Sequence, residues 1–172
     1  AMGEILEIAS THGAHIMALG AAAQTLEPVR PADLLARPER ALDLRPVREL
    51  LVGADVLLTG GGGSIGSELA RQVARQSPAS LAIVESSEFN LYQIDHHLRA
   101  LHPGLPLTSH LGDVRDTARL AAIFAESRPD IVIHAAALKH VPLVEANPCE
   151  GILTNVMGTC VVADSCKAHG VE

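Results

Sequence analysis

Short apolar runs alternate with amphipathic segments over most of the chain after residue 54. Residues 56–58, 81–84 and 131–133 are wholly apolar, as in strands buried on both faces, and 105–111 is a less regular candidate. The segments between them carry hydrophobic residues three or four positions apart, which is typical of helices with one buried face. Helices are predicted at residues 64–76, at 88–101, after Asp116, and at about 149–169. This order predicts an α/β fold with a parallel sheet covered on both faces.

The first 54 residues do not follow this alternation. Residues 1–30 are interpreted as a cloning remnant followed by the tail of a preceding domain, because they are too few to close a core. Residues 31–54 are rich in proline and alternating charge, which predicts a linker arm and then a short helix ending before Gly53. Residues 55–172 form the third predicted unit.

Composition excludes several classes of protein. The 172 residues include 13 Lys and Arg against 20 Asp and Glu, and this balance gives no basic surface for nucleic acid. Three cysteines without CxxC spacing argue for a reducing, cytoplasmic compartment and against disulfides or a zinc site. The sequence contains no signal peptide and no apolar run of about 20 residues that would span a membrane.

A glycine-rich loop lies between the first predicted strand and the helix that begins near Ser64. Gly61, Gly63 and Gly66 match GxGxxG, and Gly60, Gly63 and Gly66 match GxxGxxG. Such glycines permit a tight turn, close approach of a pyrophosphate and close packing of helix on strand. The helix N-terminus directs its free N–H groups toward phosphates. The alternative is a glycine-rich loop that binds no ligand.

Glu85 ends the second predicted strand, about 20 residues after the glycines, where a carboxylate accepts a hydrogen bond from a ribose 2′-hydroxyl. Ser86 and Ser87 follow it without an adjacent Arg or Lys. A carboxylate in this position repels a 2′-phosphate, so the sequence favours NAD over NADP. The alternative is a solvated acid at a strand end.

The ends of the other two strands provide further candidates. Asp113 is placed to accept from the adenine amino group, and Val114 to pack on the ring; the alternative is a turn followed by a helix cap. Ala135 and Ala136 follow the fourth strand, and their small side chains would let a cofactor lie against the backbone.

Lys139 and His140 come next, at the expected mouth of the crevice, where Lys139 could meet a phosphate or a substrate hydroxyl. His140 and His134 are candidate acid–base groups, although a lone histidine is more often structural. Asn155 is placed to hydrogen-bond to a neighbouring strand. Residues 96–97 are adjacent histidines that do not share a helix face, and no metal site is predicted.

Several segments together resemble one family. Residues 59–69, TGGGGSIGSEL, resemble the TGAGGSIGSEL of bacterial polysaccharide-biosynthesis nucleotide-sugar 4,6-dehydratases, the CapD-like group of extended short-chain dehydrogenases/reductases. The resemblance covers about residues 31–172. Its other blocks are SEFNLY (87–92), GDVRD (112–116), AAALKHVP (135–142), TNVMGT (154–159) and DLLARP (33–38). Glu85 departs from the family's usual Asp, which leaves NAD against NADP open.

The resemblance implies a fold and a reaction. The fold would be the first half of a Rossmann-like doubly wound parallel sheet, strand order 3-2-1-4, with a small N-terminal remnant. The enzymes use NAD(P) to take hydride from C4 of a UDP-N-acetylhexosamine, eliminate the C6 hydroxyl with the C5 proton, and return hydride to C6. The implied cofactor residues are Gly60, Gly63, Ser64, Ile65 and Gly66 at the pyrophosphate, Glu85 at the ribose, Asp113 and Val114 at the adenine, and Ala135, Ala136 and Lys139 beside the nicotinamide. Lys139, His140 and Asn155 are expected near the substrate.

The family's catalytic segments, a Ser-Thr-Asp-Lys stretch and a later Lys, have no counterpart here. We therefore expect a fragment without turnover, from a parent with a UDP-sugar substrate and an anchor in the inner membrane. The strand at 130–134 would be an unpaired edge, which predicts a homo-oligomer. The alternatives are another extended short-chain nucleotide-sugar epimerase or reductase, and a non-catalytic dinucleotide-binding module.

Overall fold

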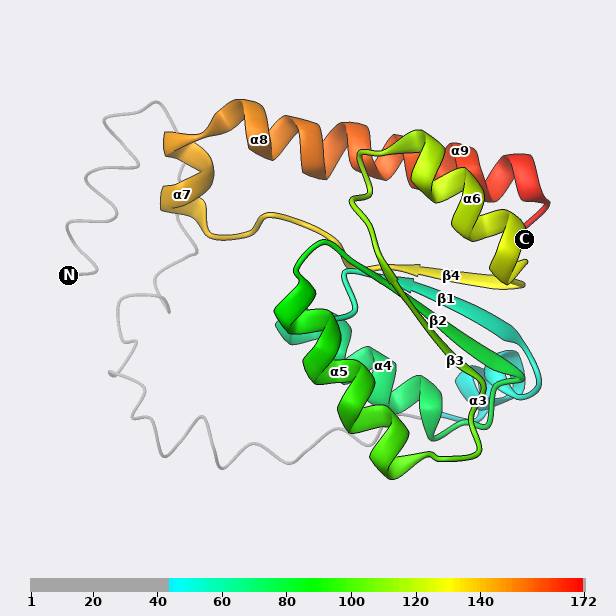
Figure 1. The fold of residues 1–172 in the computed structure, drawn as a ribbon. Coiled ribbons are helices and arrows are strands. Elements are labelled where there is room, and N and C mark those ends of the chain that lie inside the picture. The colour runs from blue at the N-terminus through cyan, green and yellow to red at the C-terminus, as the bar shows by residue number, and fades with distance from the viewer. Residues whose placement is uncertain (1–43, 172) are drawn as a thin grey trace, which may run out of the picture. The chain divides into compact units, whose positions relative to one another are not determined.

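The structure, a computed structural model, describes residues 44–171. Its centre is a four-stranded sheet in the order β3-β2-β1-β4, and every neighbouring pair is parallel (Figure 1). The strands are β1 Asp55–Thr59, β2 Ser80–Glu85, β3 Leu107–Leu111 and β4 Ile131–His134. This arrangement confirms the predicted fold class and strand order, although β3 begins two residues later than the apolar pattern indicates.

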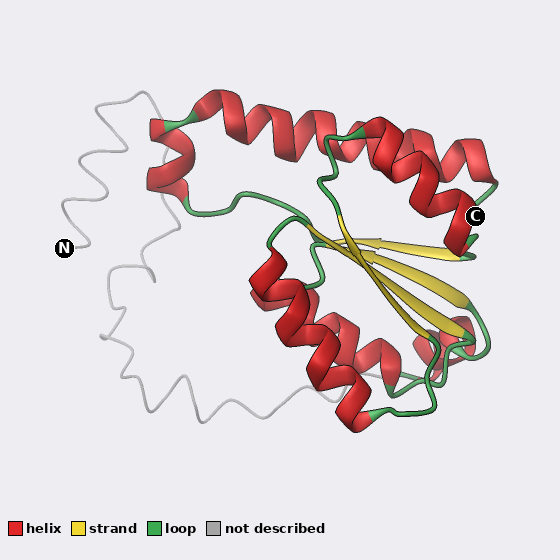
Figure 2. Ribbon diagram, viewed as in Figure 1, coloured by secondary structure: helices red, strands yellow, loops and turns green. Residues whose placement is uncertain are grey.

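Helices cover both faces of the sheet (Figure 2). One face carries α4 and α5, and the other carries α6 and α9 (Figure 1). These helices are α4 Ser64–Ala74, α5 Glu88–Leu101, α6 Thr117–Ser127 and α9 Thr159–His169. The short helix α3 Arg45–Leu51 lies before β1, and Gly53 follows it at φ +73°. This confirms the helix predicted before Gly53.

Alternate side chains of the strands supply two separate cores. Val56 and Leu58 point to the side of α4 and α5, whereas Leu57 points to the side of α6 and α9. Phe124 of α6 is fully buried on that second side. Because both strand faces are buried, the strands read as continuous apolar runs and not as alternating ones.

The helix termini carry the expected signals. Asp116 accepts a hydrogen bond from the backbone N–H of Arg119 at 2.9 Å, as a cap of α6. Gly170 ends α9 at φ +70°, in the left-handed conformation that favours glycine.

The segment after β4 differs from its prediction. A helix α7, Val141–Ala146, precedes the long helix and was not predicted. The long helix is present but consists of α8 Pro148–Ile152, a π-helical turn η2 Leu153–Gly158, and α9. Irregular turns of this kind are frequent at functional sites.

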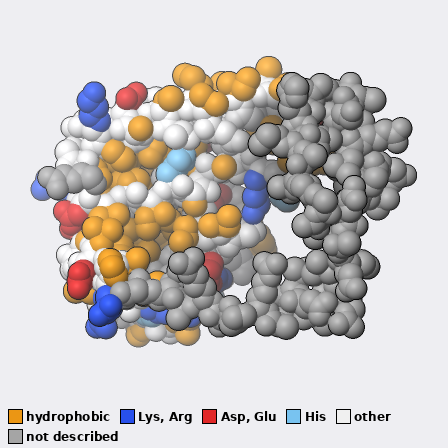
Figure 3. Space-filling model, turned by 180° about the vertical axis from the view of Figure 1, so that it is seen from behind, with side chains coloured by type: hydrophobic (Ala, Val, Ile, Leu, Met, Phe, Trp, Pro, Cys, Tyr) orange, Lys and Arg blue, Asp and Glu red, His pale blue; other side chains and the backbone are white. Residues whose placement is uncertain are grey.

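Within the described part of the chain, β4 pairs only with β1, and all four of its residues are half-buried. Seen from behind, hydrophobic side chains gather over this side of the sheet and along the long helix (Figure 3). Association through this edge stays a prediction. The predictions for residues 1–30 and for the linker up to residue 43 lie outside the described residues. None of the described helices has the length and apolar character needed to cross a membrane.

Candidate functional site

The glycine loop turns directly after β1 and packs against the segment that follows β4. Gly60 adopts φ +69°, and a Cβ there would lie 2.5 Å from the backbone nitrogen of Ala136. A Cβ on Gly66 would overlap the carbonyl oxygen of Gly60 and lie 2.8 Å from its carbonyl carbon. Both positions therefore require glycine for the packing of the loop itself.

Gly63 is different. A Cβ on Gly63 would approach only the carbonyl oxygen of Gly60, at 3.4 Å, and the residue lines a cavity. Its φ of −69° and ψ of 171° are open to any residue. Packing therefore leaves room beside Gly63, at the N-terminus of α4, where four backbone N–H groups have no intrahelical acceptor.

Glu85 is buried, so the alternative of a solvated strand-end acid is wrong. One carboxylate oxygen accepts from the backbone N–H of Gly62 at 2.9 Å. The other accepts from the backbone N–H of Ser87 at 3.0 Å and from the Ser86 hydroxyl at 3.4 Å. These contacts fix the carboxylate beside the glycine loop.

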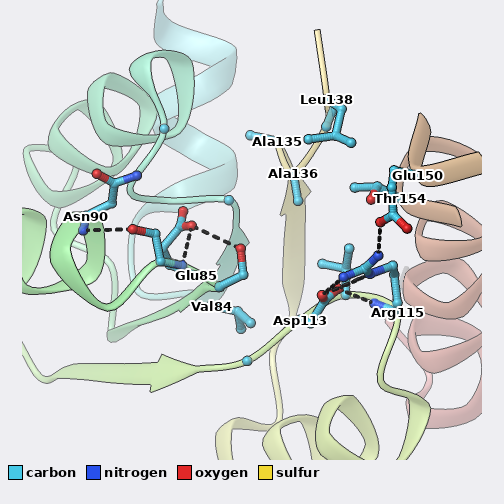
Figure 4. Close-up of a pocket in the computed structure, with 17 residues that line it drawn as sticks. Val84, Glu85, Asn90, Asp113, Arg115, Ala135, Ala136, Leu138, Glu150 and Thr154 are labelled. Atoms are coloured by element: carbon cyan, nitrogen blue, oxygen red, sulfur yellow. Dashed lines mark hydrogen bonds and ion pairs between the residues drawn. The ribbon is translucent and has the colours of Figure 1, made fainter. Parts of the chain in front are cut away.

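Asp113 faces Glu85 from the other side of the cavity (Figure 4). Its carboxylate accepts from the backbone N–H of Arg115 at 2.9 Å, and from Nε at 2.9 Å and Nη2 at 2.6 Å of the same residue. Hydrogen bonds from this guanidinium lower the pKa of Asp113 below its ordinary value. Nη1 of Arg115 extends to Glu150 of α8 at 2.7 Å. The turn predicted as an alternative role for Asp113 is therefore present, while Asp116 caps the helix.

These groups line one cavity of about 380 Å³ at the carboxyl ends of the strands. Seven predicted cofactor residues line it: Gly60, Gly63, Glu85, Asp113, Val114, Ala135 and Ala136. Four others, Ser64, Ile65, Gly66 and Lys139, are not among its lining residues. Ile65 is 62% exposed, and its part in binding stays a prediction.

The three residues expected near the substrate lie beyond this cavity. Lys139 and His140 line an adjoining cavity of about 380 Å³, which shares Ala137, Leu138 and Glu150 with the first. Asn155 lines neither cavity, and its amide is paired on both sides with the backbone of Leu138, at 2.8 Å each. It fixes the loop after β4, and does not bond to a strand as predicted.

His134 is part of a directed chain of hydrogen bonds. The Thr159 hydroxyl donates to the carbonyl oxygen of Asn155 at 2.8 Å, so it accepts from Nε2–H of His134 at 3.0 Å. Nδ1 of His134 then accepts from the Thr59 hydroxyl at 2.6 Å. Burial lowers the pKa of His134. Because His134 lines neither of these two cavities, the geometry favours its structural interpretation.

Several cavity residues were missed by sequence reasoning: Ser86, Ser87, Asn90, Arg115, Glu150 and Thr154. Arg115 carried a signal, since it lies two positions after the candidate Asp113. Thr154 opens the TNVMGT block of the resemblance, but no pattern placed it at this cavity. Glu150 carried no signal, because only the tertiary fold brings the long helix over the loop after β3. Within residues 44–171 no group of three His, Cys, Asp or Glu side chains is arranged to hold a metal ion.

A parallel sheet ordered 3-2-1-4, with a glycine-rich turn after its first strand, defines a Rossmann-like α/β protein. Residues 56–172 match the family described as "Polysaccharide biosynthesis protein", and the chain belongs to this family.

Curated relatives include the "Capsular polysaccharide biosynthesis protein CapD" of Staphylococcus aureus, 38% identical over 86% of this chain and 25% of that protein. A "UDP-N-acetylglucosamine 4,6-dehydratase (inverting)" of Campylobacter jejuni is 35% identical over 70% of this chain and 34% of that protein. The chain thus spans about a quarter to a third of these relatives.

Similar solved structures include a UDP-glucose 4-epimerase from Stenotrophomonas maltophila with bound NAD and formylated UDP-arabinopyranose. Its TM-score is 0.63 at 28% identity, covering 69% of this chain and 35% of that one. An X-ray structure of Pen from Bacillus thuringiensis gives a TM-score of 0.64 at 30% identity, covering 70% of this chain and 36% of that one.

Proposed function

We propose that this chain is the NAD(P)-binding part of a UDP-N-acetylhexosamine 4,6-dehydratase of bacterial surface polysaccharide biosynthesis. The observation that carries the proposal is the shared cavity, which Gly60 and Gly63 line together with Glu85 on one side and Asp113 on the other. The relatives named as UDP-N-acetylglucosamine 4,6-dehydratases support this substrate class.

The residues present fit a dinucleotide. Gly63, with open space beside it, and the backbone N–H groups of residues 64–66 would hold the pyrophosphate at the positive end of α4. Glu85 would hold the adenine ribose, and Asp113 with Val114 the adenine. Ala135, Ala136 and Lys139 would lie beside the nicotinamide, with Lys139 and His140 toward the substrate, while Asn155 would hold the loop that carries Leu138. Bound NAD(P) supplies the hydride acceptor for oxidation at C4 and the donor for reduction at C6.

The surroundings of Glu85 support NAD over NADP. Its neighbours in the cavity are Ser86, Ser87 and Asn90, none of which carries a positive charge. A 2′-phosphate would meet a buried carboxylate there, and the arginine that lines the same cavity, Arg115, is already paired with Asp113 and Glu150. The described cysteines are all unpaired, which supports a cytoplasmic location.

Calorimetric titration of the chain with NAD+ and, separately, NADP+ tests this site. We expect NAD+ to bind at least about tenfold more tightly, since each 1.4 kcal/mol of repulsion corresponds to a factor of ten. Equal affinity, or a preference for NADP+, would contradict the role given to Glu85. Absence of binding by either would contradict the proposed function of this chain.

The chain by itself is expected to produce no 4-keto sugar from UDP-N-acetylglucosamine and NAD+, because the catalytic segments of the resembled family have no counterpart in it. The measurement is mass spectrometry of the sugar nucleotide after prolonged incubation. A dehydrated 4-keto product would contradict this expectation.

A second candidate activity, 4-epimerisation, is favoured by the similarity to UDP-glucose 4-epimerases. The same incubation with the complete parent protein separates the two activities. A dehydratase releases a 4-keto-6-deoxy sugar, whereas an epimerase releases the 4-epimer with unchanged mass.

A further inference from the structure

Arg115 joins two walls of the cavity that are far apart in sequence. Its guanidinium holds Asp113, in the loop after β3, through Nε and Nη2. The remaining nitrogen, Nη1, contacts Glu150 at the start of the long helix, 35 residues away. Figure 4 shows this bridge opposite Glu85. An arginine bound on both sides has far less freedom to turn than an exposed one bound once.

Most of the hydrogen-bond acceptor positions of the Asp113 carboxylate are already occupied. An ionised carboxylate offers about four lone-pair directions. The backbone N–H and the Nε–H of Arg115 contact Oδ1 at 2.9 and 3.0 Å, and the Nε–H and the Nη2–H contact Oδ2 at 2.9 and 2.6 Å. Because the Nε–H is shared between the two oxygens, three N–H donors hold the carboxylate. About one acceptor direction is left, and Asp113 lines the cavity. Arg115 thus holds the carboxylate in an orientation in which one further donor, from the cavity, would satisfy its remaining acceptor position.

We propose that Arg115 is a positioning residue, which orients the Asp113 carboxylate to accept one hydrogen bond from the exocyclic amino group of the adenine base. The proposal rests on the proposed dinucleotide site and deepens it. Val114, between the two residues, supports it: the side chain is 4% exposed and packs so closely on the long helix that a Cβ on Gly158 would lie 2.8 Å from Val114 Cγ2. The backbone that carries Asp113 is therefore fixed as well.

The alternative is that Arg115 contacts a phosphate of the ligand directly. The two roles differ in one respect. A phosphate contact is indifferent to the base, whereas a residue acting through Asp113 changes how well the base is recognised. Nicotinamide hypoxanthine dinucleotide separates them, because it carries a carbonyl oxygen in place of the adenine amino group and a proton on the neighbouring ring nitrogen, and otherwise matches NAD+.

The experiment measures the ratio of dissociation constants, hypoxanthine dinucleotide over NAD+, by calorimetry on the chain and its variants. We expect a ratio of about ten or more in the unsubstituted chain, as for a hydrogen bond to a charged group. Arg115→Gln should reduce it to about three or less. Arg75→Gln, which removes the same charge outside the cavity lining, should leave it unchanged. Thermal unfolding followed by circular dichroism verifies that each variant is folded.

A double-variant comparison tests whether Arg115 acts through Asp113. In an Asp113→Asn background, Arg115→Gln should not change the ratio further. An unchanged ratio in Arg115→Gln alone, or a further fall in the double variant, would overturn the proposal while leaving the proposed function intact. If the unsubstituted chain binds neither dinucleotide, both the proposed function of this chain and the role of Arg115 are wrong.

Discussion

Gly66→Ala is expected to lower the free energy of unfolding by about 3 kcal/mol, because the new methyl group has no free space. Its Cβ would overlap the carbonyl oxygen of Gly60 and lie 3.0 Å from Cα of Gly61. These are backbone atoms of a turn, and they cannot swing aside as the end of a side chain can. Urea unfolding followed by circular dichroism measures the effect.

Gly63→Ala is the matched control, since it adds the same methyl group three residues earlier. Its nearest atom would be at 3.4 Å, an ordinary contact, so stability should change by no more than about 0.5 kcal/mol. The methyl group would stand in the cavity, however, and should weaken dinucleotide binding at least about tenfold by blocking close approach to the backbone. Equal loss of stability in both variants would contradict this separation of roles.

The sequence predicted the strands and main helices well because the local pattern and the tertiary fold agree. Residues 81–84 are apolar throughout, and the structure buries all of them. The helix α7 was missed because its six residues are too short for a periodic signal. The π-helical turn was missed because Leu153–Gly158 continues the helical period on both sides.

For the candidate site too, the residues placed by local sequence were predictable, and those placed only by the tertiary fold were not. The glycine loop follows β1, Glu85 is the last residue of β2, and Asp113 lies just after β3, so parallel pairing brings them to one edge of the sheet. Glu150 reaches the cavity only through the path of the long helix, which local sequence does not determine. His134 was recognised as a candidate, but its role depends on Thr59 and Thr159, which lie 75 and 25 residues away.

Thr59→Val is expected to lower the free energy of unfolding by about 2 kcal/mol at neutral pH. Val has nearly the same shape as Thr, so the substitution removes chiefly the hydroxyl that donates to Nδ1 of His134. Thr59 is fully buried, and water has little access to replace the lost donor. Thr159→Val removes the exposed end of the same chain of hydrogen bonds and should cost less than about 1 kcal/mol. If urea unfolding shows a larger loss of stability for Thr159→Val than for Thr59→Val, the expected dependence of the loss on burial is wrong.

The same histidine should make the fold less stable in weak acid. Burial holds the pKa of His134 in the folded chain below its ordinary value, so the unfolded chain takes up the proton first. Stability from this residue is therefore complete above about pH 6.5 and is lost as the pH falls below it. Urea unfolding at pH 7.5 and 5.5 should show a smaller loss in His134→Asn than in the unsubstituted chain. Burial also lowers the pKa of His110, which stays in the variant, so the loss shrinks without vanishing. An equal loss in both chains would show that His134 does not contribute.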